Sequence, residues 1–249
     1  MILCLAGSNT VLQDKKPEEV LSLAPFILES FVQVTPKSTK LAECYPFYML
    51  DSGAFSFMQG TKQYTKADFI AYVDSYIAYV NKNNIEHFFE MDVDVFLGYK
   101  KVLELRKYIN SETGKKCIPV WHRSRGRCEF EKMCEEYDYV AIGGLALKTI
   151  SKREYHVLPK LIAEAHRRKA KIHGLGFTNM DWLPRCHFDS VDSTTWLSGG
   201  KYGFLFKFNG KRMVRIYKPE GTRLKNSTGA HIYNFSEWLK FQKWAVNHL

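Results

Sequence analysis

The feature that most constrains the fold is an alternation of short apolar runs with helical patterns along most of the chain. Runs of this length are typical of buried strands, whereas helices need longer patterns. Strands that alternate with helices imply a parallel sheet. The runs that we interpret as strands lie near residues 2–6, 47–51, 87–92, 117–122, 139–143, 171–175 and 188–192.

Helix signals lie in the intervals between these runs. Residues 65–68 (Thr-Lys-Ala-Asp) and 151–154 (Ser-Lys-Arg-Glu) are capping-box patterns that mark the start of a helix. Apolar residues recur at helical spacing after each of them. A further, shorter pattern places Val102, Leu105 and Ile109 on one helix face. The sequence therefore predicts helices that cover the sheet.

The last part of the chain departs from this alternation. Residues 202–217 are predicted to form two strands around Asn209-Gly210, a pair typical of hairpin turns. A final helix is expected to begin near Asn234. No linker or internal repeat divides the chain, so we predict a single domain over residues 1–249.

Acidic residues follow several of the strand-like runs. Asp51, Asp92 and Asp192 each stand at the end of one, and Gly143-Gly144 ends another. Barrel enzymes draw their active sites from the carboxyl ends of many strands. A doubly wound sheet also fits the alternation, but no glycine-rich phosphate motif follows an early strand. We therefore predict a (β/α)8 barrel of the TIM type, allowing for irregularity, with a carboxy-terminal hairpin and helix.

The charge balance indicates the class of partner. Lys and Arg total 36 against 26 Asp and Glu, which gives a net charge of +10. A basic balance favours a polyanion such as nucleic acid, although a basic protein can also simply be soluble. Arg123, Arg125 and Arg127 follow a strand-like run, so they are expected on the face that carries the acids, where they would hold phosphates.

The cysteines and the apolar runs exclude other classes. The six cysteines are scattered and form no Cys-x-x-Cys pair, so neither a zinc site nor another metal or cofactor is expected. Several lie in apolar runs, which favours a reducing, cytoplasmic setting. No apolar run is long enough to cross a bilayer, so no membrane partner is expected.

Several segments resemble, in order, the motifs of the tRNA-guanine transglycosylases. Residues 51–55 (Asp-Ser-Gly-Ala-Phe) resemble that family's Asp-Ser-Gly-Gly-Phe motif, and residues 142–145 resemble its Gly-Gly-Leu strand end. Residues 173–176 (His-Gly-Leu-Gly) resemble its Met-Gly-Val-Gly segment. Residues 191–193 resemble the segment that holds its nucleophile, and Asp92 resembles its guanine-pairing acid. A second family acid corresponds to Asp189.

The chain also departs from that family. No cysteine follows Cys186, so the family's zinc site is absent, and Val120-Trp121-His122 stands where a base-recognising glutamine is expected. A compact, zinc-free, basic version is similar to the DNA-acting branch, the DpdA-type enzymes of phages and bacterial islands. This resemblance implies a glycosyltransferase of the cytoplasm, or of the host cytoplasm, that exchanges guanine in DNA for a free 7-deazaguanine base.

The chemistry of base exchange assigns roles to the acids. Attack on the anomeric carbon suits Asp192, which would form a covalent glycosyl intermediate. A second carboxyl, Asp51, would move protons on the leaving and incoming bases, and Asp92 would accept from the N–H groups of a guanine-like edge. The other residues expected to contact substrate are Ser52, Gly53, Phe55, His122, Gly143, Gly144, Leu145 and Asp189.

Details of base binding follow from residue type. The backbone N–H groups of Gly143 and Gly144 are expected to bind a carbonyl oxygen, because glycine allows close approach. Phe55, Met91 and Trp121 are expected to sandwich the base, which must be flipped out of a duplex or presented single-stranded.

Alternatives remain open at this level. Asp51 and Asp192 could cap turns, Asp189 could be structural, and His122 could be a core histidine. The chain could instead be a tRNA-guanine transglycosylase of the same mechanism, a non-catalytic nucleic-acid-binding barrel, or a glycosylase that uses water. The oligomeric state and the preferred 7-deazaguanine are also open.

Overall fold

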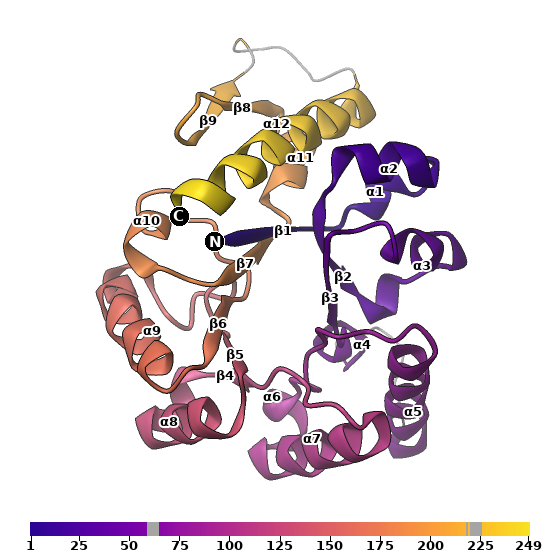
Figure 1. Cartoon of the computed structure of the whole chain (residues 1–249), viewed down its shortest axis with the longest axis vertical. Helices are drawn as coiled ribbons and strands as arrows, with labels where there is room; N and C mark the ends of the chain where they lie inside the picture. Colours follow the sequence, from indigo (N-terminus) through magenta and orange to yellow (C-terminus); the bar gives the residue numbers. More distant parts are fainter. Residues whose placement is uncertain (59–64, 218, 220–225) are drawn as a thin grey trace.

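The computed structural model describes residues 1–58, 65–217, 219 and 226–249. Seven parallel strands form one curled sheet, a half-barrel with the strand order β3-β2-β1-β7-β6-β5-β4, and helices surround it (Figure 1). The prediction of an α/β fold with a parallel sheet is confirmed. The strands of this sheet are β1 (Ile2–Ala6), β2 (Phe26–Ser30), β3 (Phe47–Asp51), β4 (Val120–Trp121), β5 (Tyr139–Ile142), β6 (Lys171–Gly174) and β7 (Ser190–Ser193).

The helices begin where the sequence places start signals. Asp68 Oδ2 accepts from the Thr65 N–H at 2.8 Å, and Glu154 Oε2 accepts from the Ser151 N–H at 3.0 Å, so both capping boxes form. No helix of the described ranges is long and apolar enough to cross a bilayer. The helices are α1 (Asn9–Leu12), α2 (Pro17–Leu23), α3 (Pro36–Ala42), α4 (Ala54–Met58), α5 (Lys66–Lys82), α6 (Asp94–Leu97), α7 (Tyr99–Thr113), α8 (Gly126–Glu136), α9 (Leu158–Arg167), α10 (Leu183–Cys186), α11 (Ser198–Tyr202) and α12 (Ser227–His248).

The sequence did not predict strand β2. Its run Phe26-Ile27-Leu28 is interrupted by Glu29, a residue that is buried in the structure. The Glu29 carboxylate accepts from Asn9 Nδ2 at 2.5 Å and from the Tyr48 hydroxyl at 3.0 Å. Both partners are distant in sequence, so nothing local identifies this glutamate as part of a buried strand.

The predicted strand at 87–92 is reduced to an irregular segment. Residues 87–90 form single bridges on both sides instead of a regular strand. The Leu50 N–H donates to the His87 carbonyl at 2.8 Å, and the Ile118 N–H donates to the Phe88 carbonyl at 2.8 Å. The segment therefore connects the end of β3 with the residues just before β4.

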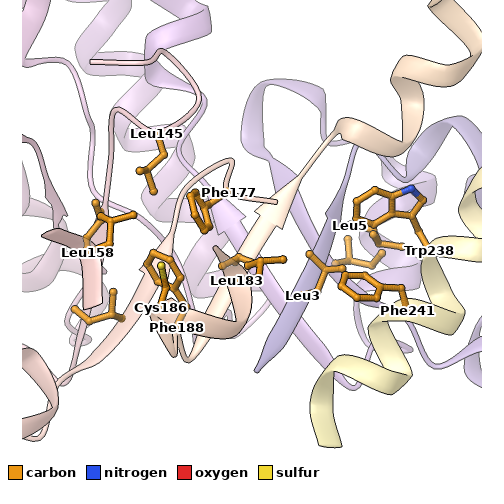
Figure 2. Close-up of a cluster of buried hydrophobic side chains, with 14 of the residues drawn as sticks. Leu3, Leu5, Leu145, Leu158, Phe177, Leu183, Cys186, Phe188, Trp238 and Phe241 are labelled. Atoms are coloured by element: carbon orange, nitrogen blue, oxygen red, sulfur yellow. The ribbon is translucent and has the colours of Figure 1, made fainter. Parts of the chain in front are cut away.

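Alternate residues of each strand pack into different clusters. Leu3 and Leu5 of β1 belong to the large cluster beneath the helices, where they lie beside Trp238 and Phe241 of α12 (Figure 2). Cys4 and Ala6 of the same strand belong to a smaller cluster. Because strand side chains alternate between faces, this smaller cluster fills the concave side of the curled sheet. Its buried members are Cys4, Ala6, Leu28, Met49, Phe89, Ile118, Val120 and Ala141.

The carboxy-terminal hairpin forms as predicted. Strands β8 (Phe204–Phe208) and β9 (Met213–Tyr217) pair antiparallel on either side of the Asn209-Gly210 turn. Helix α12 starts earlier than the predicted Asn234, because the Asn226 side chain caps it by accepting from the Gly229 N–H at 2.8 Å. Asn234 is instead a buried mid-helix residue that accepts from the Phe206 N–H at 2.7 Å.

Helix α12 also ties the first two strands together. Its Gln242 side chain donates to the carbonyls of Leu3 at 2.7 Å and Phe26 at 2.9 Å. The same side chain accepts from the Phe26 N–H at 3.1 Å. One buried amide therefore bonds backbone groups of both β1 and β2.

Candidate functional site

Three predicted acids meet at the carboxyl edge of the curled sheet. Asp51 ends β3, Asp192 lies near the end of β7, and Asp92 follows the bridging segment 87–90. Desolvation raises the pKa of Asp51 to about 6, and the negative charges of Asp192 and Asp92 also raise it. The three carboxylates therefore lie at one edge of the sheet, where Asp51 senses the charges of the other two.

The local turn holds Asp51 in place. Asp51 Oδ2 accepts from the Gly53 N–H at 3.0 Å and from Ser30 Oγ at 3.2 Å. These bonds lower the pKa of Asp51, but desolvation outweighs them. Gly53 has a φ of +64°, and a Cβ there would lie 2.7 Å from Ser30 Oγ. Glycine is therefore required next to this carboxylate, and a pKa of about 6 suits proton transfer in both directions.

Ser52 and Phe55 are the two other residues of this motif that were predicted to contact substrate. Ser52 is buried, and its carbonyl accepts from the Tyr72 hydroxyl at 2.6 Å. Its side-chain Oγ accepts from the Ala54 N–H at 3.5 Å and so supports the turn. Phe55 lies in α4, and its side chain is outside the described part of the structure.

Asp192 is held by two donors on one oxygen. Its Oδ1 accepts from the Gly176 N–H at 2.7 Å and lies 3.2 Å from His173 Nε2. The residue is 8% exposed, so the carboxylate is nearly enclosed yet reachable at the sheet edge. This arrangement fixes the orientation of one carboxylate at the sheet edge that also carries Asp51.

Asp92 is paired with a predicted neighbour. His122 Nε2 lies 2.7 and 2.9 Å from the two carboxylate oxygens of Asp92. Burial alone would lower the pKa of His122, but the hydrogen bond and charge of Asp92 outweigh it and the pKa is raised. A cavity of about 600 Å³ opens beside the pair and is lined by His122, Asp94 and Thr149, among others. A ligand can therefore reach this imidazole.

Arg125 is not placed to bind phosphate, contrary to the prediction. Its side chain is 2% exposed, and its guanidinium lies 3.1 to 3.3 Å from carboxylate oxygens of Glu90, Asp92 and Asp94. It also stacks over the Tyr99 ring at 4.4 Å. The buried guanidinium therefore balances the negative charges of these three carboxylates.

The two flanking arginines are exposed but already paired. Arg123 forms an ion pair with Glu154, and Arg127 Nε lies 2.7 Å from Glu131. The predicted cluster of three phosphate-binding arginines is thus divided between the surface and the interior.

Gly143 has a different role from the one predicted. Its N–H donates to the Trp121 carbonyl at 2.9 Å and is not available to a substrate. A Cβ on Gly143 would lie 2.5 Å from His122 Cε1, so the glycine makes room for that imidazole. Gly144 has a φ of +79°, and Leu145 is buried in the core.

Two of the predicted base-stacking residues face the helices. Trp121 packs against Phe130 at 5.2 Å between ring centroids, and its Nε1 donates to the Gly126 carbonyl at 2.8 Å. Met91 is buried with the α5 and α7 side chains. The structure therefore does not bring Met91 and Trp121 to the acids.

Asp189 lies away from the other acids. It precedes β7, at the opposite end of the strand from Asp192. Its Oδ2 accepts from the Ile172 N–H at 2.7 Å and lies 2.9 Å from His166 Nε2. Asp189 therefore joins β6, α9 and β7, away from the site.

Sequence reasoning missed a buried acid beneath the site. Glu90 is fully buried, and burial raises its pKa although Arg106 lies 2.6 Å away and Arg125 3.2 Å away. Its Oε1 also accepts from the Val120 N–H at 2.8 Å. The available signal was a pair of charges in apolar patterns, Glu90 within Phe-Phe-Glu-Met and Arg106 on the apolar face of α7.

One group in the described ranges has the geometry to hold a metal ion. Asp92, Asp94 and His122 place one ligand atom each within 4.8 Å of the others. Arg125 already contacts both carboxylates, so a cation would have to compete with its guanidinium.

No protein-family model matches the chain, and no curated protein matches it. The assignment of function therefore depends on the residues and geometry described above.

Proposed function

We propose that the chain is a transglycosylase that replaces guanine in DNA by a free 7-deazaguanine base. The observation that carries this proposal is the pair of acids at the sheet edge. Asp192 is oriented by two donors, and Asp51 at the same edge of the sheet has a pKa of about 6. One oriented carboxylate and one that exchanges protons near neutrality are what covalent base exchange requires.

We also infer that the sheet closes into a (β/α)8 barrel of the TIM type. Residues 87–90 would be its eighth, irregular strand. Their bridges to Leu50 and Ile118 support this, because they join one outer strand, β3, to the residues just before the other outer strand, β4. Closure would bring Asp51 and Asp92 to neighbouring strand ends, as barrel active sites require.

The reaction would proceed by two displacements at the same carbon. Asp192 attacks C1′ of a deoxyguanosine, the C1′–N9 bond breaks, and its electron pair leaves with the base. Asp51 in its acid form gives the leaving base a proton. The incoming base then attacks C1′ and gives a proton to Asp51, and the bond from C1′ to Asp192 breaks.

Asp92 and His122 would recognise the edge of the base. A carboxylate has about four lone-pair sites, so Asp92 can accept from a base while it bonds to His122. The cavity beside His122 gives space for the ring. Because the Arg125 side chain is buried, other basic residues would bind the phosphates.

A basic groove next to Asp192 supports a polyanionic substrate. This groove, of about 740 Å³, lies between residues 145–155 and the β8–β9 hairpin, and its lining includes Gly176, whose N–H binds Asp192. Its basic residues are Lys148, Lys152, Arg212 and Arg215.

Charge reversal in this groove is expected to weaken DNA binding. The double variant Lys148→Glu/Lys152→Glu should reduce the slope of log affinity against log salt by up to about 2, because each lost phosphate contact removes about 0.9. Titration of labelled duplex DNA at several salt concentrations measures the slope. Lys171→Glu, at the opposite end of β6, is the control and should leave the slope unchanged. Equal slopes for the groove variant and wild type would contradict the assignment.

The pKa of about 6 for Asp51 predicts a pH dependence for release of guanine. The acid form is needed in this step, and its fraction falls tenfold per unit above about pH 6. The single-turnover rate should therefore decline towards about pH 8, and Asp51→Asn should be slow without this decline. Rapid-quench measurements across this range test the prediction, and a flat wild-type profile would count against it.

The same shift affects stability without any substrate. The folded-state pKa of about 6 lies above the ordinary value of 3.8, so the folded protein binds more protons than the unfolded chain between these values. The contribution of Asp51 to the free energy of unfolding therefore falls as the pH rises through this window. Relative to wild type, Asp51→Asn should be more stable at about pH 7 than at about pH 4. Thermal unfolding of both proteins at each pH measures this difference.

The direct test is incorporation of labelled guanine or 7-cyano-7-deazaguanine into duplex DNA and, in parallel, into tRNA. Label in DNA is the expected result. Label in tRNA alone would preserve the chemistry and change the substrate. Loss of guanine with no free base supplied would identify a hydrolytic glycosylase. Salt-dependent DNA binding without exchange would indicate a non-catalytic binding protein.

A further inference from the structure

A chain of buried side chains leads from Asp192 into the sheet. Asp192 Oδ1 lies 3.2 Å from His173 Nε2, and His173 Nδ1 lies 2.5 Å from Ser190 Oγ. Ser190 Oγ in turn lies 2.5 Å from the Tyr139 hydroxyl. This series of hydrogen-bonded side chains crosses β7, β6 and β5, and it runs from the carboxyl edge of the sheet to the start of β5.

The interior gives these groups few other partners. His173 and Ser190 have no exposed surface. The His173 ring packs edge-on against Phe89, at 5.2 Å between centroids, and Phe89 belongs to the apolar cluster on the concave side of the sheet. Buried polar groups are stable only when they are hydrogen-bonded, so the direction of these bonds is constrained.

The donor of each hydrogen bond can be assigned by starting from the Asp192 carboxylate. An ionised carboxylate only accepts, so His173 Nε2 must carry the proton that points to Asp192. In a neutral imidazole Nδ1 then accepts, and Ser190 donates to it. The Ser190 oxygen accepts from the Tyr139 hydroxyl. In each of these three hydrogen bonds the proton thus points towards Asp192.

We propose that His173 is a positioning residue for the nucleophile, held in its Nε2–H tautomer by Ser190 and Tyr139. The proposal deepens the proposed function and rests on the role of Asp192 in it. His173 and the Gly176 N–H both bond Oδ1, and within the described residues no hydrogen bond engages Oδ2. The geometry therefore makes Oδ2 the attacking oxygen.

This arrangement also serves the second displacement. Attack through Oδ2 forms an ester bond to C1′ and removes the negative charge from Asp192. When the incoming base attacks C1′, the C1′–Oδ2 bond breaks and its electron pair returns to the carboxylate. Fixed donors on Oδ1 stabilise that returning charge without reorganisation, which is the property of a preorganised anion site.

The tautomer can be measured without any substrate. Long-range proton–nitrogen correlation spectra of protein labelled with ¹⁵N-histidine distinguish the two neutral tautomers and the imidazolium, and His173→Gln assigns the signal. The expected wild-type result is a neutral ring with the proton on Nε2. In Ser190→Ala the donor to Nδ1 is removed, and the signal should shift towards a mixture of forms. An Nδ1–H tautomer or an imidazolium in wild type would overturn the proposal.

Kinetics separate positioning from a merely structural role. In the exchange assay, His173→Phe should lower kcat about 10-fold to 100-fold with little change in KM, because the donor acts on the reacting carboxylate. His173→Gln retains an amide donor and should recover part of this loss. His166→Gln, in α9 beside Asp189, is the control. Full activity of a folded His173→Phe would overturn the proposal.

The two measurements distinguish this proposal from the proposed function. If wild type exchanges no base, the function fails while the tautomer result still stands. If wild type is active and His173→Phe matches it, the positioning role fails while the function stands.

Discussion

Asp192→Asn is expected to lower the rate of base exchange by at least roughly a thousandfold while the protein remains folded. The amide nitrogen and oxygen of asparagine are poor nucleophiles, so the proposed covalent intermediate cannot form. The asparagine carbonyl can still accept from the Gly176 N–H and from His173, so the local structure is retained. Label incorporation measures the rate, and thermal unfolding verifies the fold.

The chain supplies a matched control for this substitution. Asp189→Asn makes the same chemical change at the other end of the same strand, where the carboxylate bonds to Ile172 and His166. It should retain exchange activity within a few-fold of wild type. Comparable losses in the two variants would contradict the assignment of Asp192 as nucleophile.

The second large effect is expected from Arg125→Met, which should lower the free energy of unfolding by about 3–5 kcal/mol. Removal of the guanidinium leaves Glu90 buried with one cationic partner fewer. Asp92 and Asp94 also lose the charge between them. A buried ion pair that loses one partner is costly, because the remaining charge is neither hydrated nor compensated.

Arg127→Met is the comparison for this variant. Its side chain is 73% exposed and pairs with Glu131 one helical turn away, an arrangement that contributes about 0.5 kcal/mol or less. Urea unfolding of both variants measures the difference. If Arg125→Met is no less stable than Arg127→Met, the buried network does not stabilise the fold in the way described.

The sequence predicted the order of elements better than the direction of side chains. Apolar runs and capping boxes are local signals, and the helices that start at Lys66 and near Ser151 form where they indicate. Glu29 shows the limit of such signals. Its partners Asn9 and Tyr48 come from other elements, so β2 could not be identified from the residues around it.

The alternation of side chains between the two faces of a strand explains why most of the misplaced residues do not reach the site. Val120 packs on the concave side of the sheet, so its neighbour Trp121 points to the helices. Asp189 precedes Asp192 by three positions, which puts it roughly 10 Å away along the strand and on the other face. Arg125 turns inward because the chain leaves β4 through a 3₁₀ turn, Arg123–Arg125, and not through an extended loop.

The position of β1 affects the order in which the chain can fold during synthesis. Strand β1 is made before the other strands of the sheet, but it pairs with β7, and its outer face is covered by α12. The Gln242 amide that joins β1 and β2 belongs to α12, which is made after every strand of the sheet. A nascent chain that has completed β6 can pair β1 with β2, but the other edge of β1 has no strand partner until β7 is made. Completion of the sheet around β1 therefore has to wait for β7 and α12, and until then the exposed edge and apolar face of β1 are open to aggregation.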